Sequence, residues 1–195
     1  MMSHRKKLPE GLALETLAVR TGMDRSAHNE HSEALYLTSS FVFDNAAQAA
    51  ARFSGEEAGN VYARFTNPSV TLFEERLAAL EGADACVATA SGMAAITSLV
   101  MANLSAGDHI VASSSLFGST IQLLGTIMPR FGIETTFVSP RIPEEFRKAI
   151  KSNTRLLFGE TLGNPGLDVL DIPTVASIAH DAGVPLLVDS TLTSP

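Results

Sequence analysis

The sequence has few of the residues on which several classes of function depend. Its 195 residues include one cysteine and no tryptophan, and its net charge of −7 comes from 21 acidic and 14 basic side chains. A single cysteine, Cys86, allows no disulfide within the chain, which is typical of proteins in the reducing cytoplasm. The apolar neighbours of Cys86 favour a buried structural thiol over a nucleophile. We therefore expect a cytoplasmic protein.

Charge and hydropathy exclude two kinds of partner. The basic residues are scattered, so we expect no nucleic-acid partner, and the short basic cluster at 4–7 is expected to be a solvated tail. No apolar stretch follows that cluster, so we expect no secretory signal. Residues 85–107 carry no charge over the length of a membrane span, but polar side chains and a Ser91-Gly92 break interrupt them. A buried strand, a turn and a helix explain this segment better, and we expect no membrane contact.

Common cofactor and metal motifs are also missing. Neither G-x-G-x-x-G nor G-x-x-x-x-G-K-[ST] occurs, so a nicotinamide-dependent Rossmann enzyme fits only the general alternation of strands and helices. His28 and His31 are three residues apart, but no further ligand lies nearby, and we expect no metal site.

What the sequence does contain is a regular alternation of apolar strands and helices. Asn67-Pro68 is typical of a helix start, and Gly82 is typical of a helix end. The predicted strands that follow are 85–88, 109–112, 133–138, 155–159 and 184–188; the predicted helices are 91–102, 117–130, 143–151 and 172–182. Before them we predict helices at 12–21 and 46–53 and an extended segment at 35–43.

This alternation predicts an α/β fold with a mainly parallel sheet and helices on both faces. We assign residues 1–60 to an N-terminal arm with an extended segment and residues 61–195 to the α/β domain. Ligands of such sheets bind beyond the carboxyl ends of the strands. The polar residues predicted there are Ser91-Gly92, Ser113–Ser115, Glu160 and Asp189.

Two of these positions suit groups of opposite charge. At Ser91-Gly92-Met93 a helix begins, and its free amides and dipole favour a phosphate; an ordinary strand-to-helix turn is the alternative. Asp189 ends a very apolar run, where a carboxylate needs a positive partner such as a protonated ring nitrogen. A helix cap or a structural ion pair is the alternative for Asp189.

Four further side chains suit a phosphorylated ring. Tyr62 and Arg64 supply a phenol and a guanidinium on one side of an extended segment, although a surface arginine beside a packed tyrosine is the alternative. Phe117 can stack on a flat ring or belong to the core. Asn164 follows the strand that ends at Glu160, and its amide can bond a ring hydroxyl or form a turn.

Taken together and in this order, the motifs resemble the cofactor pocket of the cystathionine γ-synthase-like family, the pyridoxal-phosphate-dependent enzymes of cysteine and methionine metabolism. The likeness runs over nearly the whole chain and is carried by residues 33–43, 59–68, 91–93, 116–120, 160–165 and 188–189. Leu162 stands where relatives usually have proline, and Ser190 where asparagine is usual.

The resemblance implies the large domain of a fold-type I pyridoxal-phosphate enzyme, truncated, with residues 61–195 as the N-terminal part of the cofactor-binding domain and the C-terminal domain absent. The implied cofactor-binding residues are Tyr62, Arg64, Ser91, Gly92, Met93, Phe117, Asn164 and Asp189, with Glu160 in a supporting role. The amides of Gly92 and Met93 would hold the phosphate, Phe117 would stack on the ring, Asn164 would contact its hydroxyl and Asp189 would hold the ring nitrogen proton. Tyr62 and Arg64 would reach the phosphate of a neighbouring subunit in a homodimer or homotetramer.

The reaction that the resemblance implies is γ-replacement on O-succinyl-L-homoserine with sulfide, which gives homocysteine for methionine biosynthesis. A cystathionine γ-synthase or γ-lyase of the same family is the alternative. None of Lys6, Lys7, Lys148 and Lys151 stands in the Ser-x-x-Lys context of the family's Schiff-base lysine, so we expect no catalytic residue here and no turnover by this chain alone. A non-catalytic fragment that binds a ligand or partner through an open sheet edge is an alternative of another class.

Overall fold

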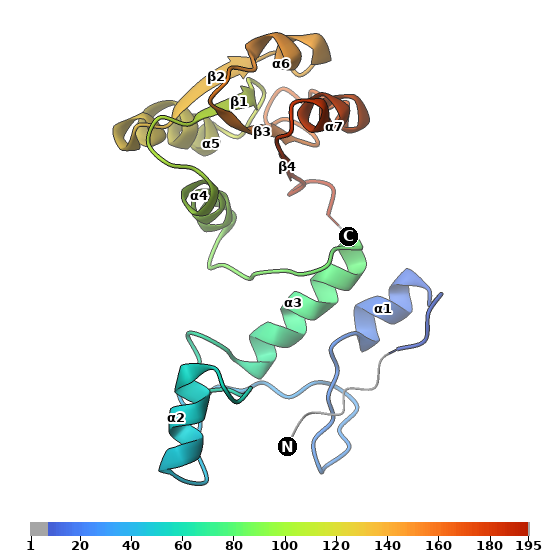
Figure 1. Ribbon diagram of the computed structural model, residues 1–195. Helices are drawn as coiled ribbons and strands as arrows, with labels where there is room; N and C mark the ends of the chain where they lie inside the picture. The colour runs from blue at the N-terminus through green and yellow to red at the C-terminus, as the bar shows by residue number, and fades with distance from the viewer. Residues whose placement is uncertain (1–7, 195) are drawn as a thin grey trace. The chain divides into compact units, whose positions relative to one another are not determined.

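A computed structural model describes residues 8–194 (Figure 1). Residue contacts divide them into two compact units, of which one ends at Ala88 and the other runs from Thr89 to Ser194. The basic cluster at 4–7 lies outside the described residues. The domain boundary after residue 60 stays a prediction.

The described part of the first unit contains three helices joined by irregular segments. They are α1 (Leu14–Arg20), α2 (Ala46–Ser54) and α3 (Pro68–Glu81). Helix α3 begins where it was predicted to begin. The side chain of Asn67 caps it by accepting a hydrogen bond from the Ser69 N–H at 2.8 Å. Its end is also as predicted, with Gly82 in the left-handed region at φ 64°.

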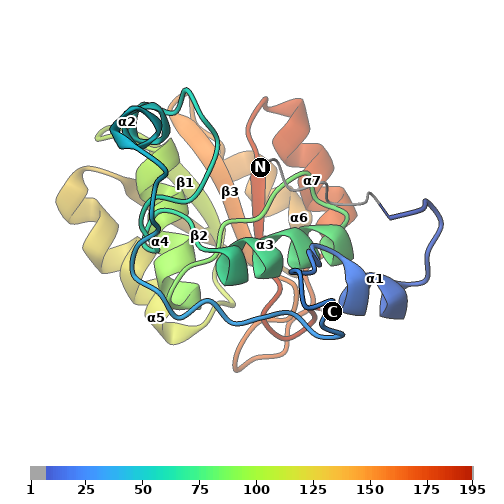
Figure 2. The ribbon, with the colours of Figure 1, turned by 90° about the horizontal axis from the view of Figure 1, so that it is seen from below.

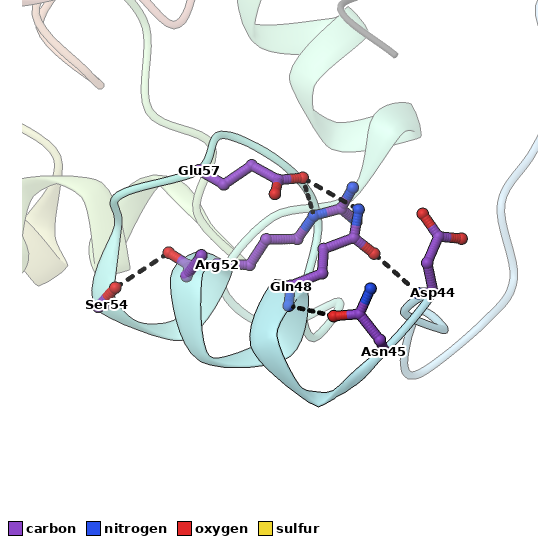
Figure 3. Close-up of polar contacts among 7 residues, drawn as sticks. Asp44, Asn45, Gln48, Arg52, Ser54 and Glu57 are labelled. Atoms are coloured by element: carbon purple, nitrogen blue, oxygen red, sulfur yellow. Dashed lines mark hydrogen bonds and ion pairs between the residues drawn. The ribbon is translucent and has the colours of Figure 1, made fainter.

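A polar network joins α2 to the loop that follows it (Figure 3). Asn45 caps the helix by accepting a hydrogen bond from the Gln48 N–H at 2.9 Å, and the side chain of Gln48 accepts from the Asp44 N–H at 2.8 Å. The Glu57 carboxylate accepts from the Gln48 amide at 3.2 Å and pairs with Arg52 at 3.1 Å. These contacts make α2 and its following loop one local piece of structure.

The strand predicted at 85–88 does not form. A strand needs a neighbouring strand, and no described segment pairs with these residues; the Ala88 N–H donates instead to the side chain of Glu74 at 2.8 Å. Cys86 is half-buried rather than buried. Burial, and then the charge of Glu74, raise the pKa of its thiol, which opposes a role as a nucleophile.

The second unit contains the predicted parallel sheet. Its strands are β1 (His109–Ser113), β2 (Glu134–Val138), β3 (Thr154–Glu160) and β4 (Leu186–Asp189), all parallel and in the order β2-β1-β3-β4. Its α-helices are α4 (Gly92–Asn103), α5 (Gly118–Gln122), α6 (Pro143–Ala149) and α7 (Ile172–Asp181). The predicted α/β class is therefore confirmed.

Alternate side chains of the central strands enter two separate cores. Ile110 and Phe158 belong to a core with α4 and α5, whereas Val111 and Leu157 belong to a core with α6 and α7. Figure 2 shows α4 and α5 on one side of the strands and α6 and α7 on the other. Both faces of the sheet are covered, which explains why the central strands β1 and β3 are buried and largely apolar.

The helix predicted over 117–130 forms, with helical backbone over 118–131, but it is not α-helical throughout. The segment consists of α5, a π-helical turn η1 (Leu123–Ile127) and a 3-10 turn η2 (Met128–Phe131). Pro129 has no N–H to continue the α-helical ladder. In addition, the Leu124 carbonyl accepts a hydrogen bond from the Thr135 hydroxyl of β2 at 3.1 Å, which favours a wider turn.

The order of the strands fixes where a ligand can bind. The chain passes from β1 outward to β2, returns to β3 on the other side of β1, and continues outward to β4. The direction of winding therefore changes between β1 and β3. In sheets of this kind ligands bind at the carboxyl ends of the strands next to this change.

The loop after β3 lies against the loop after β1. An antiparallel bridge joins Leu162 to Val169, and the Gly163 N–H donates to the Asp168 carbonyl at 2.9 Å. A methyl group on Gly163 would lie 2.6 Å from the carbonyl oxygen of Ser115. Only glycine lets the two backbones approach this closely.

His109 bridges three strands at the opposite end of the sheet. The ring is fully buried; its Nδ1 lies 2.8 Å from the Thr154 hydroxyl of β3, and its Nε2 lies 2.8 Å from the Thr136 hydroxyl of β2. Burial, and then the charge of Lys151, lower its pKa, while Glu134 opposes the shift. The ring is therefore neutral at neutral pH.

Acid is expected to destabilise the fold through His109. An unfolded histidine takes up a proton near pH 6.5, whereas the folded ring resists it, so stability is complete above that pH and falls as the pH drops through it. His109→Gln removes the titration, and its unfolding free energy in urea should change less than that of the unaltered chain between about pH 7.5 and about pH 5.5. A pH dependence in His109→Gln equal to that of the unaltered chain would contradict the assignment.

A second expected effect concerns the contact between the two loops. Gly163→Ala should lower the unfolding free energy by about 1–3 kcal/mol, because the new methyl overlaps the Ser115 backbone. Gly118→Ala is the matched control, since a methyl there meets nothing within 4 Å. Urea unfolding measures both, and an unchanged stability of Gly163→Ala would show that the loops can separate without cost.

Candidate functional site

A cavity of about 330 Å³ lies at the carboxyl ends of the strands in the second unit. Its walls come from the first turns of α4 and α5, the ends of β3 and β4, and the loops that follow these strands. Its volume is that of a site for a small molecule. The lining residues are Ser91, Gly92, Met93, Ile96, Phe117, Thr120, Glu160, Leu162, Asn164, Asp189, Thr191 and Leu192.

Most of the sequence-predicted site residues meet in this one cavity. They are Ser91, Gly92, Met93, Phe117, Glu160, Asn164 and Asp189. The serines predicted at the end of β1 do not line it: Ser113 is buried, and its hydroxyl accepts a hydrogen bond from the Ser115 N–H at 3.0 Å. The serines therefore shape the loop rather than the cavity wall.

The first turn of α4 presents open amides to the cavity. The Ser91 hydroxyl accepts from the Ala94 N–H at 3.1 Å, which caps the helix, although no strand precedes it. The N–H groups of Gly92 and Met93 have no acceptor within residues 8–194, and a methyl on Gly92 would meet nothing within 4 Å. These amides and the helix dipole suit an anion.

Two carboxylates lie side by side on another part of the wall. Glu160 and Asp189 are register partners on β3 and β4, which puts them on neighbouring strands about 4.8 Å apart. Both point to the face covered by α4 and α5, because Phe158 and Leu187, two residues earlier, pack against that core. Paired carboxylates favour a cationic group beside them.

Asp189 has one oxygen fixed and one open. Its Oδ1 accepts from the Thr191 N–H at 3.0 Å and from the Thr191 hydroxyl at 2.6 Å. Its Oδ2 has no donor among the described side chains and backbone, and none of the described ion pairs includes Asp189. The structural ion pair considered for Asp189 is therefore not present in this part of the chain.

Glu160 is buried, and each of its oxygens accepts from a backbone amide. Oε1 lies 2.7 Å from the Phe117 nitrogen, and Oε2 lies 3.2 Å from the Asn164 nitrogen. Burial raises the pKa of this carboxyl group; the two amides oppose the shift, and Asp189 adds to it. Glu160 thus connects the loop after β1 to the loop after β3.

The remaining wall suits a flat and largely apolar group. Phe117 is 47% exposed, so its ring belongs to the cavity rather than to the core. Leu162 and Leu192 add apolar surface, and the side-chain amide of Asn164, which precedes a cis proline, makes no hydrogen bond within the described residues. An aromatic ring with a hydroxyl substituent fits such a surface.

Several lining residues, among them Thr120 and Thr191, were not assigned to the site from the sequence. Thr120 is buried, and its hydroxyl contacts the sulfur of Met93 at 3.8 Å. The one indication in the sequence that Thr120 belongs to the site was its position about one helical turn after Phe117 in the predicted helix. Thr191 followed Asp189 by two residues, a spacing typical of a hydroxyl that bonds a preceding carboxylate.

Tyr62 and Arg64 lie in the first unit. The predicted extended backbone holds only as far as Tyr62, which forms an antiparallel bridge with Ser40. Residues 63–65 are a turn, in which the Phe65 N–H donates to the Tyr62 carbonyl at 2.9 Å. The side chains are nevertheless adjacent, since the Arg64 guanidinium lies 5.7 Å from the centre of the Tyr62 ring and 5.5 Å from that of Phe65. Both are exposed and accessible from solvent on that unit.

The described lysines lie away from the cavity. Lys148 is in the last turn of α6, and the Lys151 N–H donates to the Thr154 hydroxyl at the start of β3, whereas the cavity lies at the strands' other end. Within residues 8–194 no three metal-binding side chains gather, and no helix has the length and apolarity needed to cross a bilayer.

Comparison with known proteins gives relatives along almost the whole chain. The O-succinylhomoserine sulfhydrylase of Pseudomonas aeruginosa is 52% identical, over 95% of this chain and 46% of its own length. An L-methionine gamma-lyase of Treponema denticola is 39% identical, over 98% of this chain and 48% of its own. The chain thus spans about half the length of these relatives.

A solved structure and a family profile agree with the relatives. A putative O-acetylhomoserine (thiol)-lyase from Campylobacter jejuni, with N'-pyridoxyl-lysine-5'-monophosphate at its position 205, superposes with a TM-score of 0.87 at 32% identity, over 92% of this chain and 44% of that one. The profile of the Cys/Met metabolism PLP-dependent enzymes matches residues 15–195. The chain therefore belongs to the pyridoxal-phosphate-dependent enzymes of cysteine and methionine metabolism.

Proposed function

We propose that the cavity is a pyridoxal-phosphate site and that the chain is the N-terminal part of the cofactor domain of a homoserine sulfhydrylase. The intact enzyme would replace the succinyl group of O-succinyl-L-homoserine with sulfide and so form homocysteine. The observation that carries the proposal is a single cavity that combines open helix amides, an aromatic side chain and an open carboxylate oxygen.

The donor set of the cavity fits each part of the cofactor. The amides of Gly92 and Met93 would hold its phosphate, and the Phe117 ring would cover its flat ring. The Asn164 amide would bond the ring hydroxyl, and the open Oδ2 of Asp189 would accept the proton of the ring nitrogen. When bound, the cofactor supplies an electron sink for the charge that develops on the substrate carbon.

Asp189 would act by holding a proton in place. Thr191 fixes its Oδ1 with two hydrogen bonds, which orients the carboxylate and leaves Oδ2 toward the ligand. The neighbouring carboxylate of Glu160 adds negative charge beside it. Both effects favour the protonated form of a ring nitrogen at this position.

Tyr62 and Arg64 would complete the phosphate site from a second copy of the chain. None of the lining residues is basic, so a phosphate dianion in the cavity lacks a cationic side chain. Arg64 and Tyr62 form an exposed cationic and hydroxyl-bearing pair that suits this task. A homo-oligomer with a site shared between subunits is therefore part of the proposal.

The choice of substrate rests on the relatives. The identity of 52% to an O-succinylhomoserine sulfhydrylase supports O-succinyl-L-homoserine as the amino-acid substrate. The relative that is an L-methionine gamma-lyase, at 39%, supports γ-elimination from methionine as the second candidate. Both reactions would use the same cofactor site, so the cavity alone favours neither.

Binding of pyridoxamine 5'-phosphate tests the cavity, because this form of the cofactor needs no covalent bond to the protein. The chain has no tryptophan, so the fluorescence of the ligand can be followed directly. Asp189→Asn should weaken binding about 10- to 100-fold, since the hydrogen bond to a charged group is lost. Asp181→Asn, at an exposed ion pair with Arg147, should bind like the unaltered chain; equal binding by Asp189→Asn would refute the assignment of the ring nitrogen.

The reaction itself is tested on the protein isolated from its natural source. We expect homocysteine to form from O-succinyl-L-homoserine and sulfide about tenfold or more faster than from the O-acetyl ester. Thiol analysis of the products measures both rates. Faster release of methanethiol from methionine would contradict the proposal and favour a γ-lyase.

A further inference from the structure

Glu160 is a buried residue whose two carboxylate oxygens accept hydrogen bonds from backbone amides of two different loops. Oε1 accepts from the Phe117 N–H at 2.7 Å, in the loop after β1, and Oε2 accepts from the Asn164 N–H at 3.2 Å, in the loop after β3. The two loops leave the sheet on either side of the point where its winding changes direction. One side chain thus ties together the two segments that border the cavity there.

The residues that donate these bonds also carry the two side chains proposed to contact the ring. Phe117 and Asn164 both line the cavity, and each is held by its own backbone N–H. Phe117 is also the N-cap of α5 and has no side-chain cap of its own. Its carbonyl accepts from the Thr120 and Ile121 N–H groups of α5, so the bond from its N–H to Glu160 is what joins this helix start to β3.

We propose that Glu160 is a positioning residue of the site: it fixes the distance between the loops after β1 and β3, and so holds the Phe117 ring and the Asn164 amide against the same ligand. The inference rests on the proposed function, because it takes the ligand to be a phosphorylated aromatic ring. Glu160 also lines the cavity, and its charge beside Asp189 is a separate effect on the ring nitrogen; the positioning role acts on the ligand through the two loops.

The chemistry of a carboxylate is needed for this task. The two amides reach different oxygens of Glu160, Oε1 and Oε2; a glutamine in the same position would turn its NH₂ group, which cannot accept, toward one of them. An aspartate is one methylene shorter and would not span both loops from the same strand position.

The cost of this arrangement also argues for a functional role. Glu160 is 7% exposed and sits beside Asp189 in the strand register, so burial and a like charge both oppose its ionised form.

The test compares two ligands on the full 195-residue chain. Pyridoxamine 5'-phosphate uses the ring-binding side chains and the helix amides, whereas inorganic phosphate uses the amides alone and is measured by its displacement of the first ligand. Glu160→Gln should weaken pyridoxamine 5'-phosphate about 10- to 100-fold and leave the phosphate constant within about twofold. Glu144→Gln, in an exposed pair with Arg147, is the matched control and should change neither.

Glu160→Asp separates position from charge. It keeps the negative charge beside Asp189 but shortens the side chain, and we expect it to weaken pyridoxamine 5'-phosphate as well. Full binding by Glu160→Asp would assign the effect to charge and overturn the positioning role. If Glu160→Gln does not fold, as judged by circular dichroism, Glu160→Asp carries the same comparison of ligands.

The remaining outcomes distinguish this inference from the proposed function. If the unaltered chain does not bind pyridoxamine 5'-phosphate, or phosphate does not displace it, the proposed function fails and the inference fails with it. If the unaltered chain binds and Glu160→Gln binds equally well, the inference alone is overturned. Equal weakening of both ligands would show a general structural role and would also overturn it.

Discussion

The parallel pairing of β3 with β4 is the constraint on which the candidate site depends. Its register sets Glu160 opposite Asp189 and turns both carboxylates to the face covered by α4 and α5. A slip of one residue would move one of the acids to the opposite face, because side chains alternate along a strand. The electrostatic character of the cavity is thus decided by backbone hydrogen bonds within the sheet.

The cavity wall divides charge between its backbone and its side chains. Positive potential comes from the first turn of α4, where peptide amides lack acceptors, and negative potential comes from two strand-end acids. A ligand that carries an anionic tail and a protonated ring complements both regions. Pyridoxal phosphate, the cofactor of the family, has both features.

Sequence signals predicted a helix correctly where the residues at its two ends determine where it begins and stops. Asn67 and Gly82 bound α3 as expected, because a side-chain cap and a left-handed glycine act within a few residues. The long helix at 117–130 was predicted in its extent but not in its change of type, because the Thr135 hydroxyl that bonds the Leu124 carbonyl lies on a separate strand. The strand at 85–88 failed because pairing depends on a neighbour that an apolar run does not reveal.

The site residues were likewise predicted where a local or general signal sufficed and missed where packing decides. The rule that polar residues gather at the carboxyl ends of parallel strands brought Glu160 and Asp189 together correctly, and the helix start at Gly92 joined them. Thr120 and Leu192 could not be predicted, since their place in the wall depends on how α5 and the loop after β4 pack. The turn at Tyr62 and Arg64 depends on backbone hydrogen bonds that spacing alone does not indicate.

The separation of the two cores has a practical consequence. No side chain of the core formed with α6 and α7 reaches the cavity, while the core with α4 and α5 contributes Ile96 to its wall. The α6 and α7 layer is thus the natural place for substitutions that raise heat resistance. Substitutions at Phe146, Val175 or Ile178 change the core on the opposite face of the sheet from the cavity. The sheet lies between these residues and the cavity wall.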